Sequence, residues 1–156
     1  MKYMTAGELR GASLVAIVDD APAGLRLQAA SIQADLDRWS HGCSCGERRE
    51  VDCAAILSGV SADGRTTGSP LSLVVDNATY RASLEDEAPG QAAVPRPGSA
   101  DLAGLLATDA NDCQSIVEGS SARSQAALIA ASAVAREFLA EFGVEIQSYD
   151  TRIGAA

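Results

Sequence analysis

A long run of small and apolar residues in the last quarter of the sequence constrains the fold more than any other feature. Ser120 or Ser121 is a suitable helix N-cap and Gly143 a suitable C′ residue, so a helix is predicted between them. Between Ala126 and Ala135 nearly every side chain is small or apolar, and this stretch has no polar face. A helix that is apolar all round must be covered on more than one side.

The remaining apolar runs predict an antiparallel sheet. The β-branched run 11–20 ends at a Pro-Gly turn signal and predicts a strand. Runs 54–60 and 70–75 flank a Gly-containing connection and predict a hairpin. Residues 144–153 alternate in part and predict a closing strand. Four such strands make one small sheet.

One further helix and the chain length complete the predicted architecture. A short amphipathic helix over 31–40 begins at Ser31, with its apolar residues at spacings of four and three. The chain has 156 residues and a mass of 16.0 kDa, which fits one domain. We therefore predict a single α+β domain over 1–156, in which a helix layer covers a four-stranded antiparallel sheet.

A single sheet covers only one side of such a helix layer. The apolar middle of the helix over 120–143 would then find its second cover in another subunit, which predicts a homodimer packed helix layer to helix layer. The alternative is an alanine-rich helix whose exposed alanines are harmless, because isolated exposed alanines cost little free energy. The sequence pattern leaves both open.

The net charge excludes some kinds of binding partner, and the first residues and the cysteines indicate the cellular compartment. The formal net charge is -9 and the 12 basic residues are scattered, which opposes binding to nucleic acid or to anionic membranes. The first residues lack the apolar core of a signal peptide, so we expect a cytoplasmic protein with reduced thiols. The segment 77–100 has no regular pattern, and its length favours either a binding loop or a disordered segment.

Four residues in the middle of the chain have side chains that bind zinc in other proteins: His41, Cys43, Cys45 and Cys53. Their spacing differs from the usual zinc signature, in which paired cysteines stand two residues apart. We therefore expect free thiols and no metal site. The sequence also contains no dinucleotide fingerprint, P-loop or nucleophile elbow.

Several multi-residue motifs follow one another along nearly the whole chain. The segment 5–11 reads TAGELRG, and 95–104 reads PRPGSADLAG. Further motif residues lie at 22–25, 48–50, 52, 56–60, 64, 67–70, 120–123 and 133–144. In this order they resemble the N-terminal part of the chorismate synthase family, whose corresponding signatures are TAGESHG and PRPGHADLAG.

The resemblance implies a fold and an assembly. In that family, helices lie between two four-stranded antiparallel sheets, and each half of the chain supplies about one sheet. A chain similar to the N-terminal half would have one sheet and an uncovered helix layer. The resemblance therefore implies that two copies rebuild the sandwich, with a pocket at or near their interface.

The departures from the family pattern fall on its chemistry. Two family histidines, described as proton donors to the flavin and to the leaving phosphate, correspond here to Arg10 and Ser99. Neither side chain can shuttle a proton near neutrality as histidine does. The first arginine of the flavin-contacting RSSAR segment is Gly119, the glutamate after that segment is Ser124, and the C-terminal half with its flavin contacts is missing. We therefore expect no cofactor, FMN included.

The polar residues at motif positions form the candidate site. We expect catalytic or orienting roles for Glu8, Arg10, Ser99 and Asp101. We expect ligand contacts from Arg48, Arg49, Arg96, Ser120, Ser121 and Arg123. Arginines that converge with a capped helix N-terminus favour a carboxylate or phosphate group. The alternative is that Glu8 and Arg10 pair locally and that Arg123 lies on a solvated helix face.

Two main classes of function follow from these residues. The first is a repurposed, flavin-independent lyase or cyclase that acts on a small molecule in specialised metabolism. Elimination, isomerisation and pericyclic ring closure can proceed by binding, orientation and charge stabilisation alone. The second is a non-catalytic homologue that binds a ligand or a partner protein. A truncated synthase fragment is less favoured, because the substitutions fall on the chemistry while the packing residues are intact.

Overall fold

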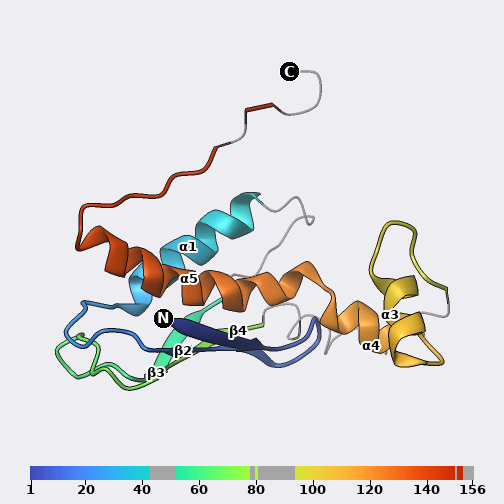
Figure 1. The fold of residues 1–156 in the computed structure, drawn as a ribbon, viewed down its shortest axis with the longest axis horizontal. Coiled ribbons are helices and arrows are strands. Elements are labelled where there is room, and N and C mark those ends of the chain that lie inside the picture. The colour runs from blue at the N-terminus through green and yellow to red at the C-terminus, as the bar shows by residue number, and fades with distance from the viewer. Residues whose placement is uncertain (43–51, 78–79, 81–93, 150, 153–156) are drawn as a thin grey trace.

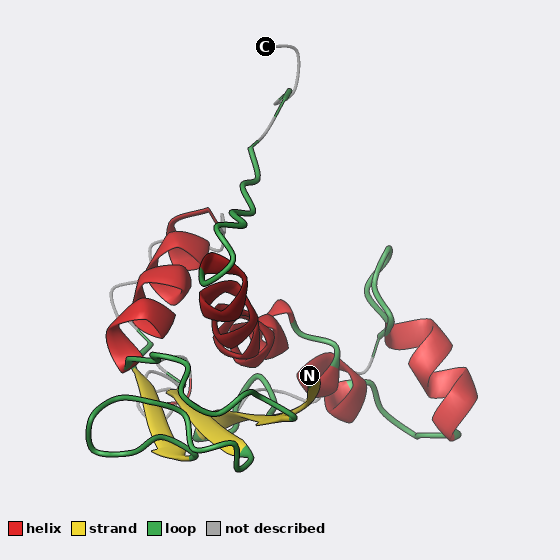
Figure 2. Ribbon diagram, turned by 60° about the vertical axis from the view of Figure 1, so that its left-hand side comes forward, coloured by secondary structure: helices red, strands yellow, loops and turns green. Residues whose placement is uncertain are grey.

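The computed structural model describes residues 1–42, 52–77, 80, 94–149 and 151–152. Its centre is an antiparallel sheet with the strand order β1-β2-β4-β3 (Figures 1 and 2). The strands are β1 (Lys2–Ala6), β2 (Ser13–Asp19), β3 (Ala54–Ser58) and β4 (Leu71–Asp76). The strand predicted over 11–20 is confirmed as β2, and the predicted hairpin as β3 and β4.

The prediction of a closing strand over 144–153 is wrong for the part that the structure describes. Residues 144–149 belong to no strand, and all six are exposed. The fourth strand is β1, which pairs with β2 so that Met4 lies opposite Ile17. The sequence pattern missed β1 because its five residues are all exposed and do not alternate. An edge strand of this kind is defined by its partner rather than by its own pattern.

Two helices lie side by side on one face of the sheet, α1 (Ala29–Gly42) and α5 (Gln125–Ala140) (Figure 1). The helix predicted over 31–40 is confirmed, but it begins two residues earlier. Ser31 is not its N-cap, because this residue lies inside the first turn and its hydroxyl donates to the Gln28 carbonyl at 2.9 Å.

The long predicted helix is confirmed as α5, although its first residues form a separate turn. Residues Ala122–Ser124 make a 3-10 turn, η1, and the Ser121 hydroxyl caps it by accepting from the backbone N–H of Arg123 at 3.2 Å. At the other end, Gly143 has a φ of +68°, which glycine adopts without strain, as predicted for the residue after the helix.

The core lies between the sheet and the helix layer. Alternate residues of β2 and β4 point to the helices and are buried, namely Leu14, Ala16, Val18, Leu71, Leu73 and Val75. The facing side of α5 consists mostly of alanines, which allow the helix to lie close against the strands. Ile32 and Leu36 of α1 complete this core.

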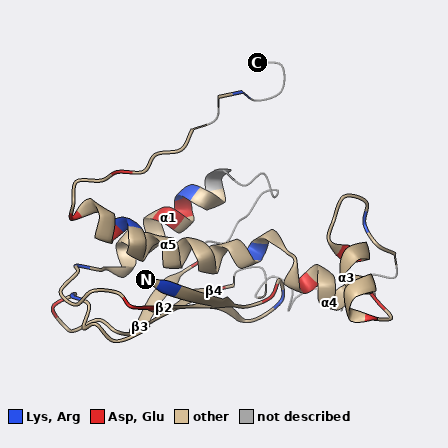
Figure 3. Cartoon of the chain, in the orientation of Figure 1, with Lys and Arg blue, Asp and Glu red and all other residues tan. Residues whose placement is uncertain are grey.

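The side of α5 that faces away from the sheet is only partly covered. Leu128, Ile129, Ala135 and Leu139 are half-buried there, and Ser132 is exposed. The middle of the helix carries no charged residue (Figure 3). The structure therefore gives α5 a cover on two sides, from the sheet and from α1, and leaves a third side open.

Two short helices form an arm beyond the end of the sheet, α3 (Asp101–Thr108) and α4 (Gln114–Gly119) (Figure 2). They pack on each other where Gly104 meets Ile116, so closely that a Cβ at Gly104 would lie 2.6 Å from the Ile116 side chain. The residues before the arm belong to the irregular segment predicted over 77–100. Within it, 78–79 and 81–93 lie outside the described residues, and 94–100 contain no helix or strand.

No helix in the described part of the chain has the length and the apolar character needed to cross a membrane.

Candidate functional site

The first motif loop lies against the arm at the end of the sheet. The backbone N–H of Leu9 donates to the Glu118 carbonyl at 3.2 Å, and the N–H of Arg10 donates to the Glu118 carboxylate at 2.9 Å. The Arg10 guanidinium lies 3.7 Å from the same carboxylate, and Gln114 donates to it at 2.7 Å. Glu118 thus joins the TAGELRG loop to α4.

A buried polar cluster lies behind this loop and is built around Arg123. Its guanidinium forms an ion pair with Asp52 through two nitrogen atoms, and its Nε donates to the Asn77 side-chain oxygen at 3.0 Å. The Asn77 amide nitrogen in turn donates to the carbonyls of Leu9, at 2.8 Å, and Gly11, at 2.7 Å. Arg123 is only 2% exposed. This residue therefore holds η1, β4 and the motif loop together.

The burial of Arg123 corrects one alternative drawn from the sequence. Arg123 does not lie on a solvated helix face, because η1 turns its side chain inward between Asp52 and Asn77. The local pair of Glu8 and Arg10, which belonged to the same alternative, is also not formed, since Arg10 pairs with Glu118 while Glu8 is exposed.

A second cluster fixes the start of α3. Arg96 forms a forked ion pair with Asp101, with Nε to Oδ2 at 2.8 Å and Nη2 to Oδ1 at 3.0 Å. The Asp101 side chain is fully buried, whereas that of Arg96 is 58% exposed. The Ser99 hydroxyl accepts from the Asp101 backbone N–H at 3.2 Å and donates to the Arg96 carbonyl at 2.8 Å.

These contacts set the protonation of the second cluster. Hydrogen bonds from Arg96 hold the pKa of Asp101 well below its usual range. The same contact raises the pKa of Arg96. Burial raises the pKa of the nearby Cys113 thiol. At neutral pH Asp101 is therefore a charged carboxylate whose oxygens are both occupied by Arg96.

The structure divides the predicted site residues into groups. It brings Arg10, Ser121 and Arg123 to the end of the sheet, and it places Arg96, Ser99 and Asp101 together on the arm. Ser120 is exposed, and its backbone N–H donates to the Ile116 carbonyl at 2.8 Å. Arg48 and Arg49 lie outside the described residues.

The structure describes only some of the residues considered for zinc. Cys43 and Cys45 lie outside the described residues, as does the side chain of His41, while Cys53 is exposed. Among the residues that the structure describes, no three His, Cys, Asp or Glu side chains are grouped as metal ligands.

Three residues of these clusters were not assigned a role from the sequence: Asp52, Asn77 and Glu118. Asp52 is one of the motif residues, and Asn77 directly follows β4. Their contacts join residues that are far apart in the sequence. Arg10 and Glu118 are 108 positions apart, Arg123 and Asn77 are 46 apart, and Arg123 and Asp52 are 71 apart. Only the folded chain shows such contacts.

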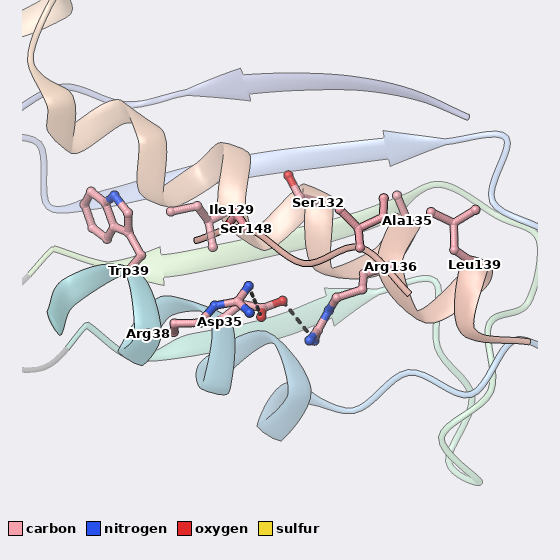
Figure 4. Close-up of a pocket in the computed structure, with 10 residues that line it drawn as sticks. Asp35, Arg38, Trp39, Ile129, Ser132, Ala135, Arg136, Leu139 and Ser148 are labelled. Atoms are coloured by element: carbon pink, nitrogen blue, oxygen red, sulfur yellow. Dashed lines mark hydrogen bonds and ion pairs between the residues drawn. The ribbon is translucent and has the colours of Figure 1, made fainter. Parts of the chain in front are cut away.

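Two hollows flank α5, and neither is lined by a residue of the candidate site. A groove of about 890 Å³ follows the seam with α1 and is lined by residues of both helices and of the segment after α5 (Figure 4). A smaller hollow of about 170 Å³ lies on the β1 side, where Tyr3 and Val18 face Leu128, Ala131 and Ala135. The second hollow is almost entirely apolar.

Comparison with known proteins accounts for the motif order. The family model for chorismate synthase matches residues 1–156. The chain belongs to the chorismate synthase family. It is 43% identical to a chorismate synthase of Pelodictyon phaeoclathratiforme over 166 residues, which cover 100% of this chain and 42% of the relative. It is 42% identical to that of Carboxydothermus hydrogenoformans over 163 residues, covering 99% of this chain and 42% of the relative.

A solved structure supports the same family. A crystal structure of chorismate synthase matches this fold with a TM-score of 0.71 and 35% sequence identity, over 91% of this chain and 34% of that chain. The resemblance inferred from the motifs is thus confirmed, and so is the predicted α+β fold. The chain spans about two-fifths of the length of the curated relatives that it matches. Those relatives are named as enzymes, so the chain belongs to an enzyme family.

Proposed function

We propose that this chain is a non-catalytic member of the chorismate synthase family that acts as a binding protein. The observation that carries the proposal is the pairing of the described arginines at motif positions. Arg10, Arg96 and Arg123 each have a carboxylate of the same chain as partner. Each of these three arginines has a carboxylate that it does not share with another of them, so it holds loops and helix ends together, and its charge is offset and not available to stabilise a reacting anion.

The same contacts argue against acid–base chemistry at Asp101. This carboxylate is fully buried, and Arg96 occupies both of its oxygens. A general base must reach the proton that it removes, and its pKa must lie near the working pH. The pKa of Asp101 is shifted in the opposite direction. Ser99 supports the same turn through two hydrogen bonds.

The proposed protein works without flavin. A flavin phosphate is held by cations or by backbone N–H groups that have no other partner. At the end of the sheet, Arg123 is buried against Asp52, Arg10 faces Glu118, and Gly119 offers no side chain. The described residues therefore do not fit the phosphate of FMN.

The proposed partner is a second copy of the chain, packed helix layer to helix layer. The open side of α5 is lined by Leu128, Ser132 and Ala135, and the apolar hollow beside β1 extends it to Tyr3, which is 63% exposed. Ser132 and Ala135 are small enough for another helix to approach closely. A two-fold axis through this surface would cover it in both copies.

Native mass spectrometry and an FMN titration test this function. We expect a dimer at micromolar concentration and no change in flavin absorbance or fluorescence on mixing. Ala135→Glu, on the open side of α5, should yield a monomer, because a charge would be buried at the contact. Leu57→Glu is the matched control, since Leu57 is 65% exposed on the opposite face of the sheet. A monomeric parent protein would overturn the dimer, and saturable FMN binding would overturn the flavin-free function.

A flavin-independent lyase or cyclase is the second candidate, and one observation favours it. Glu8 is exposed and the Arg10 side chain is 36% exposed, so both can reach a small molecule at the end of the sheet. The test begins with any small molecule retained by the protein purified from its host. Conversion of that molecule should be lost in Glu8→Gln and Arg10→Ala. Turnover that both variants leave unchanged would reject these residues as its catalysts.

A further inference from the structure

The groove between α1 and α5 lies outside the candidate site, because none of the candidate catalytic or ligand-binding residues lines it, although Ala135, Arg136 and Leu139 of the motif range 133–144 do. Its volume of about 890 Å³ falls in the range of small-molecule sites, which is roughly 300–1,000 Å³. Ile146 and Ser148, from the segment after α5, also line it. The groove therefore has walls on both helices and on a third segment.

One carboxylate in the groove serves two arginines. Asp35, whose side chain is 9% exposed, lies 3.2 Å from Arg38 Nη2 and 2.9 Å from Arg136 Nη2. The only other carboxylate paired with these arginines in the described part of the chain is Glu137, 3.6 Å from the same Arg136 atom. Each guanidinium carries five N–H groups, so most of these donors are not used by Asp35.

The guanidinium of Arg136 is the less satisfied of the two. Its contacts with described residues, to Asp35, Glu137 and the Ser31 carbonyl, all run through Nη2. Its Nε–H is buried and has no acceptor among those residues. Buried donors are almost always paired. The side chain is 38% exposed, so a rotation could bring this donor to an acceptor within the groove.

Apolar residues also line the groove. Trp39 and Ile129 lie together at one end, and Arg136 and Leu139 lie farther along α5 (Figure 4). The two arginines thus lie beside an apolar end formed by Trp39 and Ile129. We propose that the groove binds a small organic monocarboxylate, with the carboxylate against Arg136 and Arg38 and an apolar body against Trp39 and Ile129. Arginine binds a carboxylate through paired hydrogen bonds, which gives the carboxylate its advantage over a neutral group.

This inference goes beyond the proposed function, because it assigns a ligand site to each single chain. Ser132 and Ala135 line both the groove and the apolar hollow beside β1, whereas Arg38 and Arg136 line the groove and not the hollow. The ligand test therefore uses variants of these two arginines, so that oligomeric mass reports on the dimer while ligand affinity reports on the groove.

The chain supplies its own probe for the test. Trp39 is the single tryptophan of the sequence, and it lines the groove. Cyclohexanecarboxylate, titrated into the full chain near pH 7, should change the tryptophan emission in a saturable way. Cyclohexanecarboxamide has a similar shape and no charge, and we expect it to bind at least about tenfold more weakly.

Variants assign the effect to the groove. Arg136→Gln should weaken carboxylate binding by about tenfold or more and leave carboxamide binding unchanged. Arg38→Gln should cause a smaller loss, and it is safe for folding because Arg38 is 71% exposed. Arg26→Gln is the control, since Arg26 is exposed and does not line the groove. Native mass spectrometry should show the same oligomeric state for all three variants.

Three results would overturn the site. The first is equal affinity for the carboxylate and the carboxamide, and the second is an affinity that Arg136→Gln and Arg38→Gln leave unchanged. The third is a tryptophan emission that responds to protein concentration and not to the carboxylate, which would place a second copy in the groove instead of a ligand.

Discussion

Two regions of the molecule use the same pair of residue types in different settings. In the body, formed by the sheet with α1 and α5, Arg123 and Asp52 are both buried, at 1% and 7% side-chain exposure. In the arm, formed by α3 and α4, Asp101 is buried but Arg96 is 58% exposed. Water can replace a lost partner of Arg96, whereas nothing can replace a lost partner of Arg123.

The difference indicates how stability is distributed. The body has a core shared by β2, β4 and α5, and Arg123 ties this core to the motif loop. The arm is joined to the motif loop at Glu118 and closed internally at Gly104 and Ile116. We therefore expect the arm to open without the body, since regions with little buried apolar surface open first.

Removal of the Asp52 carboxylate should give the largest effect. Asp52→Ala leaves the Arg123 charge buried without its ion-pair partner, which costs about 3–5 kcal/mol of the free energy of unfolding. Denaturant unfolding, followed by circular dichroism, measures the loss for the whole domain. Asp19→Ala, at an exposed position of β2, should stay within about 0.5 kcal/mol of the parent. A similar loss in both variants would contradict the anchoring role of the buried pair.

A substitution in the motif loop should have the next largest effect. Gly7 has a φ of +136°, and a Cβ there would lie 2.9 Å from the Leu14 Cα atom. Gly7→Ala should therefore destabilise the whole body by about 1–3 kcal/mol. Gly119→Ala is the matched control, because a Cβ at Gly119 meets nothing within 4 Å. Equal thermal midpoints for the two variants would show that the loop is not tied to the core.

The smallest effect should come from the arm and should be local. Asp101→Asn removes the charge that pairs with Arg96, so amide protection should fall within α3 and remain unchanged in β2 and β4. Hydrogen exchange, corrected for the intrinsic rate at each pH, measures this. A loss of amide protection that extends to the sheet would show that the arm and the body open as one cooperative unit.

Low pH should weaken the arm of the unsubstituted protein as Asp101→Asn does. The pKa of Asp101 is lowered in the folded state, so its contribution to stability is present above the unfolded value of about 3.9. This contribution is lost as the pH falls below that value toward the folded pKa. Protection of α3 in the parent should therefore be constant between about pH 5 and 7 and should decline below about pH 4. In Asp101→Asn this decline should be absent.

The elements that the sequence predicted correctly are those with strong local patterns. The β2 run and the β3–β4 hairpin are rich in β-branched and apolar residues between turn signals, and α5 is a long run of helix-forming residues that ends before Gly143. The arm helices were not assigned. They have 8 and 6 residues, and each contains a glycine.

The remaining differences come from contacts distant in sequence. Residues 144–149 alternate as a strand would, but pairing needs a neighbour, and the described part of the chain provides none for them. The motif comparison selected the arginines of the candidate site. It did not show that Arg123 would be buried, because Asp52 is 71 residues away and only the fold brings the two together.

The strand order also has a consequence for how the chain folds during synthesis. The two central strands, β2 and β4, are separated in sequence by α1 and β3, and Ser13 pairs with Asp76. Closing a loop of this length costs entropy before any contact compensates for it, so the central pairing forms slowly. The apolar face of β2 remains uncovered until α5 is synthesised, because α5 follows all four strands in the sequence. A chain arrested before α5 would expose that face, and we expect such nascent chains to depend on chaperones.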